Sequence, residues 1–133
     1  MTPVNMPKII NFHKDYSGFG VSGMQKAVSN SILRGRPFGG VAILVHNDYL
    51  KYVSCLHASE RFVVMNFHKT VLINLYLPCN TSDSENIVHG ILAEIGGNIN
   101  LHQGYDIFLG GDFNIDLTIN SNRSKMITEF IND

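Results

Sequence analysis

The chain has 133 residues, 44% of them hydrophobic and 16% charged, with a formal net charge of −1. This length and composition exclude an intrinsically disordered chain and predict one globular domain or part of one. Ten basic residues against eleven acidic ones give no basic excess, so the composition does not indicate a strong, sequence-independent binder of nucleic acid.

Cysteines, histidines and targeting signals carry little information here. Cys55 and Cys79 are far apart and neither belongs to a Cys-x-x-Cys pair, which predicts free thiols. The six histidines have no spacing that pairs them as metal ligands. Because no signal peptide or membrane-spanning stretch is apparent, we expect an intracellular protein, nuclear or cytoplasmic, without membrane association. These features leave its oligomeric state open.

The N-terminal part of the chain shows little regular pattern. Residues 1–21 form a poorly patterned segment ahead of a domain predicted over residues 22–133, and residues 13–18 are typical of an exposed loop. Residues 24–36 show a weak helical rhythm that ends at a cluster of glycine and proline. Regular structure is therefore predicted mainly beyond this region.

The middle of the chain is rich in β-strand patterns. Residues 41–45 are apolar and β-branched, which predicts a buried strand, and residues 52–56 predict another short strand. Two further runs, Arg61–Phe67 and Val71–Leu77, are separated by three polar residues and predict an antiparallel hairpin. Pro78 ends the second run because proline cannot donate a hydrogen bond to a neighbouring strand.

Helical periodicity appears in the C-terminal half. Ser82 with Glu85 three residues later makes a capping box, and apolar residues then recur at helical spacing from Ile87 to Ile99. Asn120 or Ser121 is predicted to cap a last amphipathic helix, whose apolar residues are Met126, Ile127, Phe130 and Ile131. Strands mixed with such helices predict a layered α/β fold.

The stretch Ile107–Asn114 contains the residues that point most directly to a functional site. Its apolar residues predict a buried strand that ends at Gly110 and Gly111, where glycine lets the backbone bend and lets a bulky group approach. Asp112 and Asn114 follow two residues apart, a spacing at which side chains of an extended chain point the same way. The two side chains are therefore predicted to converge on one ligand.

Two other interpretations compete for this stretch. Asp112, Asn114 and Asp116 match the opening of a calcium-binding EF-hand loop. That loop needs a glycine and a bidentate glutamate where Leu117 and Arg123 stand, which argues strongly against calcium. A simple turn after the strand is the other interpretation, because Asp and Asn often bond their own backbone there.

Three motifs together resemble the endonuclease/exonuclease/phosphatase superfamily of metal-dependent phosphodiesterases and phosphatases. They are Gly39-Gly40-Val41-Ala42-Ile43-Leu44, Asn74-Leu75-Tyr76-Leu77-Pro78 and Gly111-Asp112-Phe113-Asn114. Their order and rough spacing agree with that family. The variants at 35–40 and 76–79 look most like the endonuclease domain of non-LTR retrotransposon polyproteins, which nicks target DNA. The resemblance covers most of the chain.

The resemblance implies a two-sheet β-sandwich flanked by helices in four layers, here partial, and magnesium-dependent hydrolysis of a DNA phosphodiester. Asp112 would orient or deprotonate the attacking water and would contribute to Mg²⁺ binding. Asn114 would hold the phosphate or that water, and Tyr76 would direct its hydroxyl at a phosphate oxygen. Asn74 and Asn80 would help to bind phosphate.

The sequence departs from the family at two places. The family has a metal-binding glutamate ahead of the Gly-Gly-Val strand, whereas the first glutamate here is Glu60. The family's Ser-Asp-His segment near the C-terminus has no counterpart here. We therefore expect this polypeptide to be inactive or nearly so alone. Two alternatives stay open: a non-catalytic remnant or nucleic-acid-binding fragment, and a phosphatase of the same superfamily.

Overall fold

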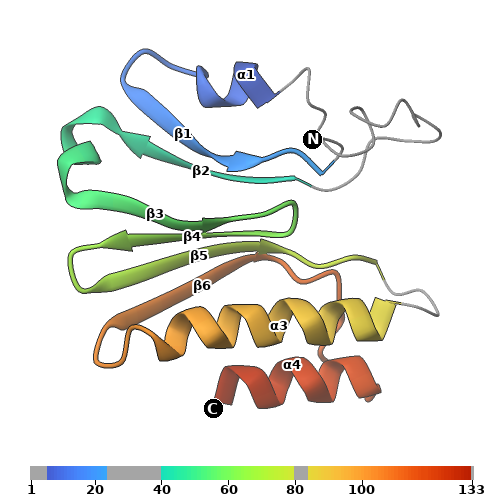
Figure 1. Cartoon of the computed structure of the whole chain (residues 1–133). Coiled ribbons are helices and arrows are strands. Elements are labelled where there is room, and N and C mark those ends of the chain that lie inside the picture. The colour runs from blue at the N-terminus through green and yellow to red at the C-terminus, as the bar shows by residue number, and fades with distance from the viewer. Residues whose placement is uncertain (1–5, 24–39, 80–83, 133) are drawn as a thin grey trace.

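A computed structural model describes residues 6–23, 40–79 and 84–132 of the chain (Figure 1). The elements are α1 (Met6–Ile10), β1 (Tyr16–Val21), β2 (Val41–His46), the 3-10 helix η1 (Asn47–Tyr52), β3 (Val53–Ala58), β4 (Phe62–Phe67), β5 (Thr70–Tyr76), α3 (Ser84–Asn100), β6 (Asp106–Asp112) and α4 (Asn122–Asn132). Within the described residues β1 and β2 form one sheet, and β3, β4, β5 and β6 form another in that order. The fold is therefore mixed α/β.

The four-stranded sheet combines antiparallel and parallel pairing. The pairs β3–β4 and β4–β5 are antiparallel, and the predicted hairpin is confirmed, with Phe67 opposite Thr70 beside its turn. His68 adopts a φ of 56° in that turn. The pair β5–β6 is parallel because α3 connects the end of β5 to the start of β6, as a parallel crossover requires.

Helices α3 and α4 lie along one face of this sheet (Figure 1). The apolar face predicted for α3 is confirmed by burial of Val88, Ile91, Leu92 and Ile95, which pack with Phe62, Val64, Ile73 and Leu75 from the sheet. Ile87 is the exception, since it is exposed. Ser121 caps α4 as predicted, because its hydroxyl accepts a hydrogen bond from the Ser124 amide at 3.1 Å.

The opposite face of the four-stranded sheet packs against the β1–β2 sheet. Alternate residues of β4, Val63 and Met65, point this way and are fully buried with Val41 of β2. Phe19 and Ile43 pack against the same cluster. Strand β4 is therefore buried on both faces, and two sheets with flanking helices agree with the coarse architecture expected from the sequence.

Three local predictions are wrong. The stretch 13–18 was expected as a loop, but β1 begins at Tyr16; its serine and glycines have low strand propensity, and pairing with β2 overrides that preference. Strand β2 was expected to be buried, but among its residues only Val41 is, because its sheet has two strands in the described part of the chain. Strand β6 was also expected to be buried, yet Phe108 is 64% exposed. It is the last strand of its sheet among the described residues.

Other predictions fall on parts of the chain that the structure does not describe. The weak helical rhythm at 24–36 and the capping residue Ser82 lie outside the described residues. So does Gly39, the first residue of the Gly-Gly-Val motif, whereas Gly40 directly precedes β2 and the rest of the motif lies within β2.

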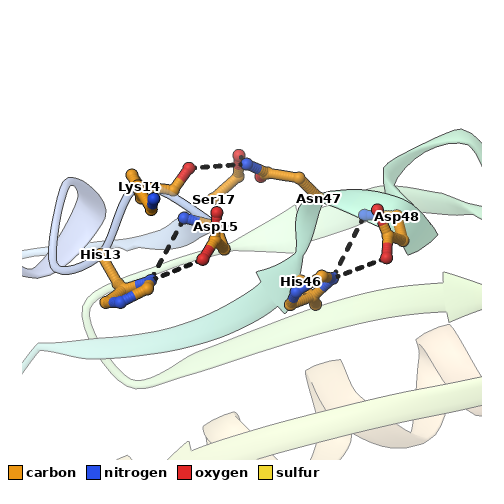
Figure 2. A network of polar contacts seen from close by, with 7 residues as sticks. All are labelled: His13, Lys14, Asp15, Ser17, His46, Asn47 and Asp48. Carbon is orange, nitrogen blue, oxygen red and sulfur yellow. Dashed lines mark hydrogen bonds and ion pairs between the residues drawn. The ribbon is translucent and has the colours of Figure 1, made fainter.

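Polar contacts join the turn before β1 to the residues after β2 (Figure 2). The side-chain amide of Asn47 donates to the carbonyl of Lys14 at 2.9 Å, and its oxygen accepts from the Ser17 hydroxyl at 2.9 Å. The backbone amide of Asn47 also donates to the Asp15 carbonyl. These contacts hold together the ends of the two strands that pair.

Two histidines in this region each contact the aspartate two residues later (Figure 2). The Nδ1 atom of His13 lies 3.5 Å from a carboxylate oxygen of Asp15, and that of His46 lies 3.4 Å from Asp48. Each contact is local to its own turn. The described residues do not bring the two pairs together as a group that could hold a metal ion.

Candidate functional site

The strand register brings two of the sequence motifs together. Tyr76 is the direct partner of Asp112 in the parallel pair β5–β6, and Asn74 is the partner of Gly110. Leu75, between Asn74 and Tyr76, belongs to the helix-side core, so its two neighbours face the opposite way. Tyr76 and Asp112 therefore occupy the same end of the sheet, on the face away from the helices.

Asp112 and Asn114 do not continue the strand together as predicted. Strand β6 ends at Asp112, and Asn114 adopts a left-handed φ of 49°. The Asn114 amide donates to Oδ1 of Asp112 at 3.0 Å, which is the turn interpretation raised by the sequence. Oδ2 of Asp112 has no hydrogen-bond partner among the described residues, and Asp112 is exposed. One carboxylate oxygen is thus available to water or a ligand.

The side chain of Asn114 is held against the end of β5. Its Nδ2 atom donates to the Leu77 carbonyl at 2.8 Å, and its Oδ1 atom lies 3.7 Å from the Cys79 sulfur, which acts as a weak donor. An amide nitrogen carries two hydrogens, so one donor is left for a ligand. The main role of the Asn114 side chain in this structure is therefore to link the segment after β6 to the segment after β5.

Only one of the two glycines is required by close packing. Gly111 has a φ of 133°, and a Cβ atom there would lie 2.0 Å from the Leu75 carbonyl oxygen. Gly111 therefore lets the backbone of β5 lie close to β6, and the close approach predicted for a ligand is made by β5 instead. A Cβ atom on Gly110 would meet nothing within 4 Å.

The predicted phosphate-binding asparagines have different outcomes. The Asn74 side-chain amide donates to the Ala42 carbonyl at 3.0 Å and so ties β2 to the four-stranded sheet. Asn80 lies outside the described residues. A groove of about 480 Å³ beside Asn74 is mostly apolar and is lined in part by Ile43, Leu72 and Phe108. Groups suited to phosphate are thus concentrated at the strand ends rather than along the groove.

Arg61 is a residue of this region that sequence reasoning missed. Its carbonyl accepts a hydrogen bond from the Tyr76 amide at 2.7 Å, and its guanidinium carbon lies 5.5 Å from the centre of the Tyr76 ring. The predicted hairpin contained the signal. Counting outward from its turn, where Phe67 is opposite Thr70, places Arg61 opposite Tyr76.

Arg123 is the second residue that was missed, and its role is structural. It is only 1% exposed, and Nη2 donates to the carbonyls of Pro78 and Phe113, the latter at 3.2 Å. Nη1 donates to the Ser84 hydroxyl at 3.3 Å. Burial lowers the pKa of the Arg123 guanidinium, although an arginine stays charged at ordinary pH. This buried cation holds the loops after β5 and β6 next to each other.

Asp116 forms a separate turn beyond the site. Its Oδ1 atom accepts hydrogen bonds from the Thr118 hydroxyl at 2.6 Å and the Thr118 amide at 2.9 Å. These two bonds, the hydroxyl first, lower the pKa of the exposed Asp116 carboxyl. The EF-hand interpretation fails here, because Arg123, at the place of its final glutamate, is buried in other contacts.

The described residues do not form a complete metal site. They contain no group of three or more His, Cys, Asp or Glu side chains that could hold an ion. Asp112 offers one free carboxylate oxygen, whereas Mg²⁺ takes six oxygen ligands and often obtains several of them from water and substrate phosphate. This donor set does not fit a resident magnesium ion. It fits only a magnesium ion that binds together with a substrate phosphate and takes one ligand, the Asp112 carboxylate oxygen, from the protein.

The chain matches no protein-family model, no curated protein and no solved structure. In the part of the chain that is described, none of the helices is long and apolar enough to cross a membrane. The geometry above is therefore the basis for functional inference.

Proposed function

We propose that this chain belongs to a DNA endonuclease of the endonuclease/exonuclease/phosphatase type, most like that of retrotransposons, and that its chemistry is phosphodiester hydrolysis. The observation that carries the proposal is the pairing of Tyr76 with Asp112. Two motifs that are distant in sequence, 74–78 and 111–114, meet at one end of the sheet. A chance match of short motifs would give no reason for that juxtaposition.

Each residue has a defined task in this proposal. The free Oδ2 atom of Asp112 orients the attacking water and accepts its proton, because hydrolysis needs a nucleophile activated near the phosphate. Tyr76 donates its hydroxyl hydrogen to a non-bridging phosphate oxygen, where negative charge develops. The remaining amide hydrogen of Asn114 donates to the same phosphate or to the water.

The histidine that acts with the scissile phosphate in the family belongs to a Ser-Asp-His segment, which has no counterpart in this sequence. We assign protonation of the leaving oxygen to no described residue. Mg²⁺ that binds together with the substrate phosphate would neutralise part of the phosphate charge. We therefore propose that substrates with a good leaving group react, whereas ordinary DNA reacts at or near background.

The test compares two substrates that differ in the leaving group. A p-nitrophenyl ester of thymidine phosphate expels p-nitrophenolate, a stable anion that needs no proton, so we expect slow, Mg²⁺-dependent release of p-nitrophenol in its anionic form. Asp112→Ala should abolish it, whereas Asp116→Ala, which removes an exposed carboxylate from the neighbouring turn, should not. Supercoiled plasmid should remain un-nicked.

Two results would contradict these expectations. Equal release by the unsubstituted chain and Asp112→Ala would remove the proposed role of Asp112 and the proposed function with it. Plasmid nicking that depends on Mg²⁺ and Asp112 would confirm the function but show that a proton donor exists within the chain.

A second candidate is a DNA-binding module without catalytic activity. The observation in its favour is that, among the described residues, this site has one available carboxylate oxygen, on Asp112, rather than a set of metal ligands. Salt-dependent DNA binding together with no p-nitrophenol release would support this candidate over the nuclease.

A further inference from the structure

Arg61, Tyr76 and Asp112 form a row across three neighbouring strands. Arg61 directly precedes β4 and is hydrogen-bonded through its carbonyl to the Tyr76 amide, while Tyr76 is the register partner of Asp112. The row therefore crosses the sheet at the end where β4 begins and β5 and β6 finish. Neighbouring strands lie about 4.8 Å apart, so the backbones of the two outer residues are about 10 Å apart.

All three side chains belong to the face of the sheet that lies opposite the helices, which is the face on which the β1–β2 sheet packs. Phe62, the residue after Arg61, and Leu75, the residue before Tyr76, both belong to the helix-side core. Because side chains alternate along a strand, Arg61 and Tyr76 lie on the opposite face, as the contact between guanidinium and ring confirms. A ligand that reaches Tyr76 and Asp112 therefore also approaches Arg61.

The charge of Arg61 is not used within the described structure. It forms no ion pair with a described carboxylate, and its guanidinium contacts the ring of Tyr76. Arg123 is different, because it is buried and donates to two carbonyls and a hydroxyl. An arginine held on an aromatic face keeps its outer hydrogen-bond donors free, and paired donors of this kind match a phosphate.

We propose that Arg61 binds a backbone phosphate of DNA adjacent to the phosphate that Tyr76 and Asp112 approach. The inference rests on the proposed function and extends it, since a separation of about 10 Å exceeds the width of one phosphate group. Arg61 also offsets the negative charge of Asp112, which would by itself repel a polyanion. The DNA strand thus runs across this end of the sheet, from β6 toward β4.

The experiment measures DNA binding rather than hydrolysis. A fluorescein-labelled DNA duplex is titrated with the chain in EDTA, and anisotropy is followed from about 50 to about 200 mM salt. One lost phosphate contact should weaken binding about tenfold at the lowest salt and reduce the slope of log K against log salt by about 1 in Arg61→Ala. Arg61→Lys keeps the charge and should retain most of the slope.

Lys51→Ala is the matched control. Lys51 also contacts an aromatic face, with its ammonium 4.8 Å from the centre of the Tyr52 ring, but it lies at the opposite end of the sheet, before β3. Its loss changes the net charge as much as Arg61→Ala does. We expect Lys51→Ala to bind like the unsubstituted chain, and circular dichroism of each variant establishes that it is folded.

Several outcomes would overturn the inference: no DNA binding by the unsubstituted chain, equal losses in Arg61→Ala and Lys51→Ala, or an unchanged slope in Arg61→Ala. Failure of the proposed function is a separate result. If Arg61→Ala loses binding as expected but the chain releases no p-nitrophenol, Arg61 is confirmed as a phosphate contact of a site without hydrolytic activity.

Discussion

The side-chain amide of Asn114 donates to the carbonyl of Leu77 at 2.8 Å, so a residue just beyond β6 secures the end of β5. The bond depends on the left-handed backbone of Asn114, at a φ of 49°. Asparagine tolerates this conformation better than most residues because its short side chain bonds locally. The geometry of the site therefore depends on both the amide group and the backbone of Asn114.

Replacing Asn114 separates these two contributions. Asn114→Ala loses the hydrogen bond and keeps the unfavourable φ, which should lower the free energy of unfolding by about 2 kcal/mol. Asn114→Gly also loses the bond but adopts the φ freely, so its loss should be smaller by about 1 kcal/mol. Urea unfolding followed by circular dichroism measures both. Equal losses would mean that the left-handed backbone carries no cost.

The adjacent glycines provide an internally matched pair. In Gly111→Ala the new Cβ would overlap the Leu75 backbone at a φ of 133°, so we expect the free energy of unfolding to fall by more than about 2 kcal/mol. In Gly110→Ala the Cβ meets open space, and the change should stay within about 1 kcal/mol. Thermal or urea unfolding of both variants is the measurement. Similar destabilisation of the two would contradict the packing described for Gly111.

The two described arginines should differ sharply in their effect on stability. Arg123→Met leaves the carbonyls of Pro78 and Phe113 without their charged donor and should lower the free energy of unfolding by about 3 kcal/mol. Arg61→Met, which leaves the backbone hydrogen bond to Tyr76 intact, should change it by no more than about 0.5 kcal/mol. A comparable loss in both variants would show that Arg123 does not hold the loops as described.

The turn at Asp116 gives a pH-dependent prediction. Because bonds from Thr118 lower the pKa of the folded Asp116, its contribution to stability is present above the unfolded pKa of about 3.9. That contribution is lost as the pH falls through the lower, folded pKa. Thr118→Val removes the hydroxyl donor, so the Asp116 titration in carboxyl ¹³C NMR should move upward. Thr118→Ser should leave it in place; no shift in Thr118→Val would show that the hydroxyl bond has no role.

Local sequence pattern was sufficient for much of the fold. The β4–β5 hairpin and the apolar face of α3 follow from alternation and helical spacing, which neighbouring residues determine. Strand β1 could not be predicted in this way, because Gly18 and Gly20 weaken its pattern and pairing with β2 supplies its stability. Exposure of Phe108 depends on which strand is last in the sheet, and that is a property of topology.

The candidate site was predictable only in part. Asp112 and Tyr76 were found through motifs, and their register as neighbours agrees with a shared role that is still a prediction. The convergence of Asp112 with Asn114 along a strand was wrong, because the strand stops between them. Arg123 had no local signal, since the carbonyls it binds belong to loops that only the tertiary fold brings together.

The crossover through α3 has a consequence for the order of folding. The antiparallel pairs β3–β4 and β4–β5 close over short turns, whereas β6 meets β5 only after the whole segment between Tyr76 and Asp106 has returned across the sheet. Contacts between distant residues carry a larger loop-closure entropy and form later than local ones. Tyr76 should therefore be in place within an early hairpin before Asp112 arrives beside it.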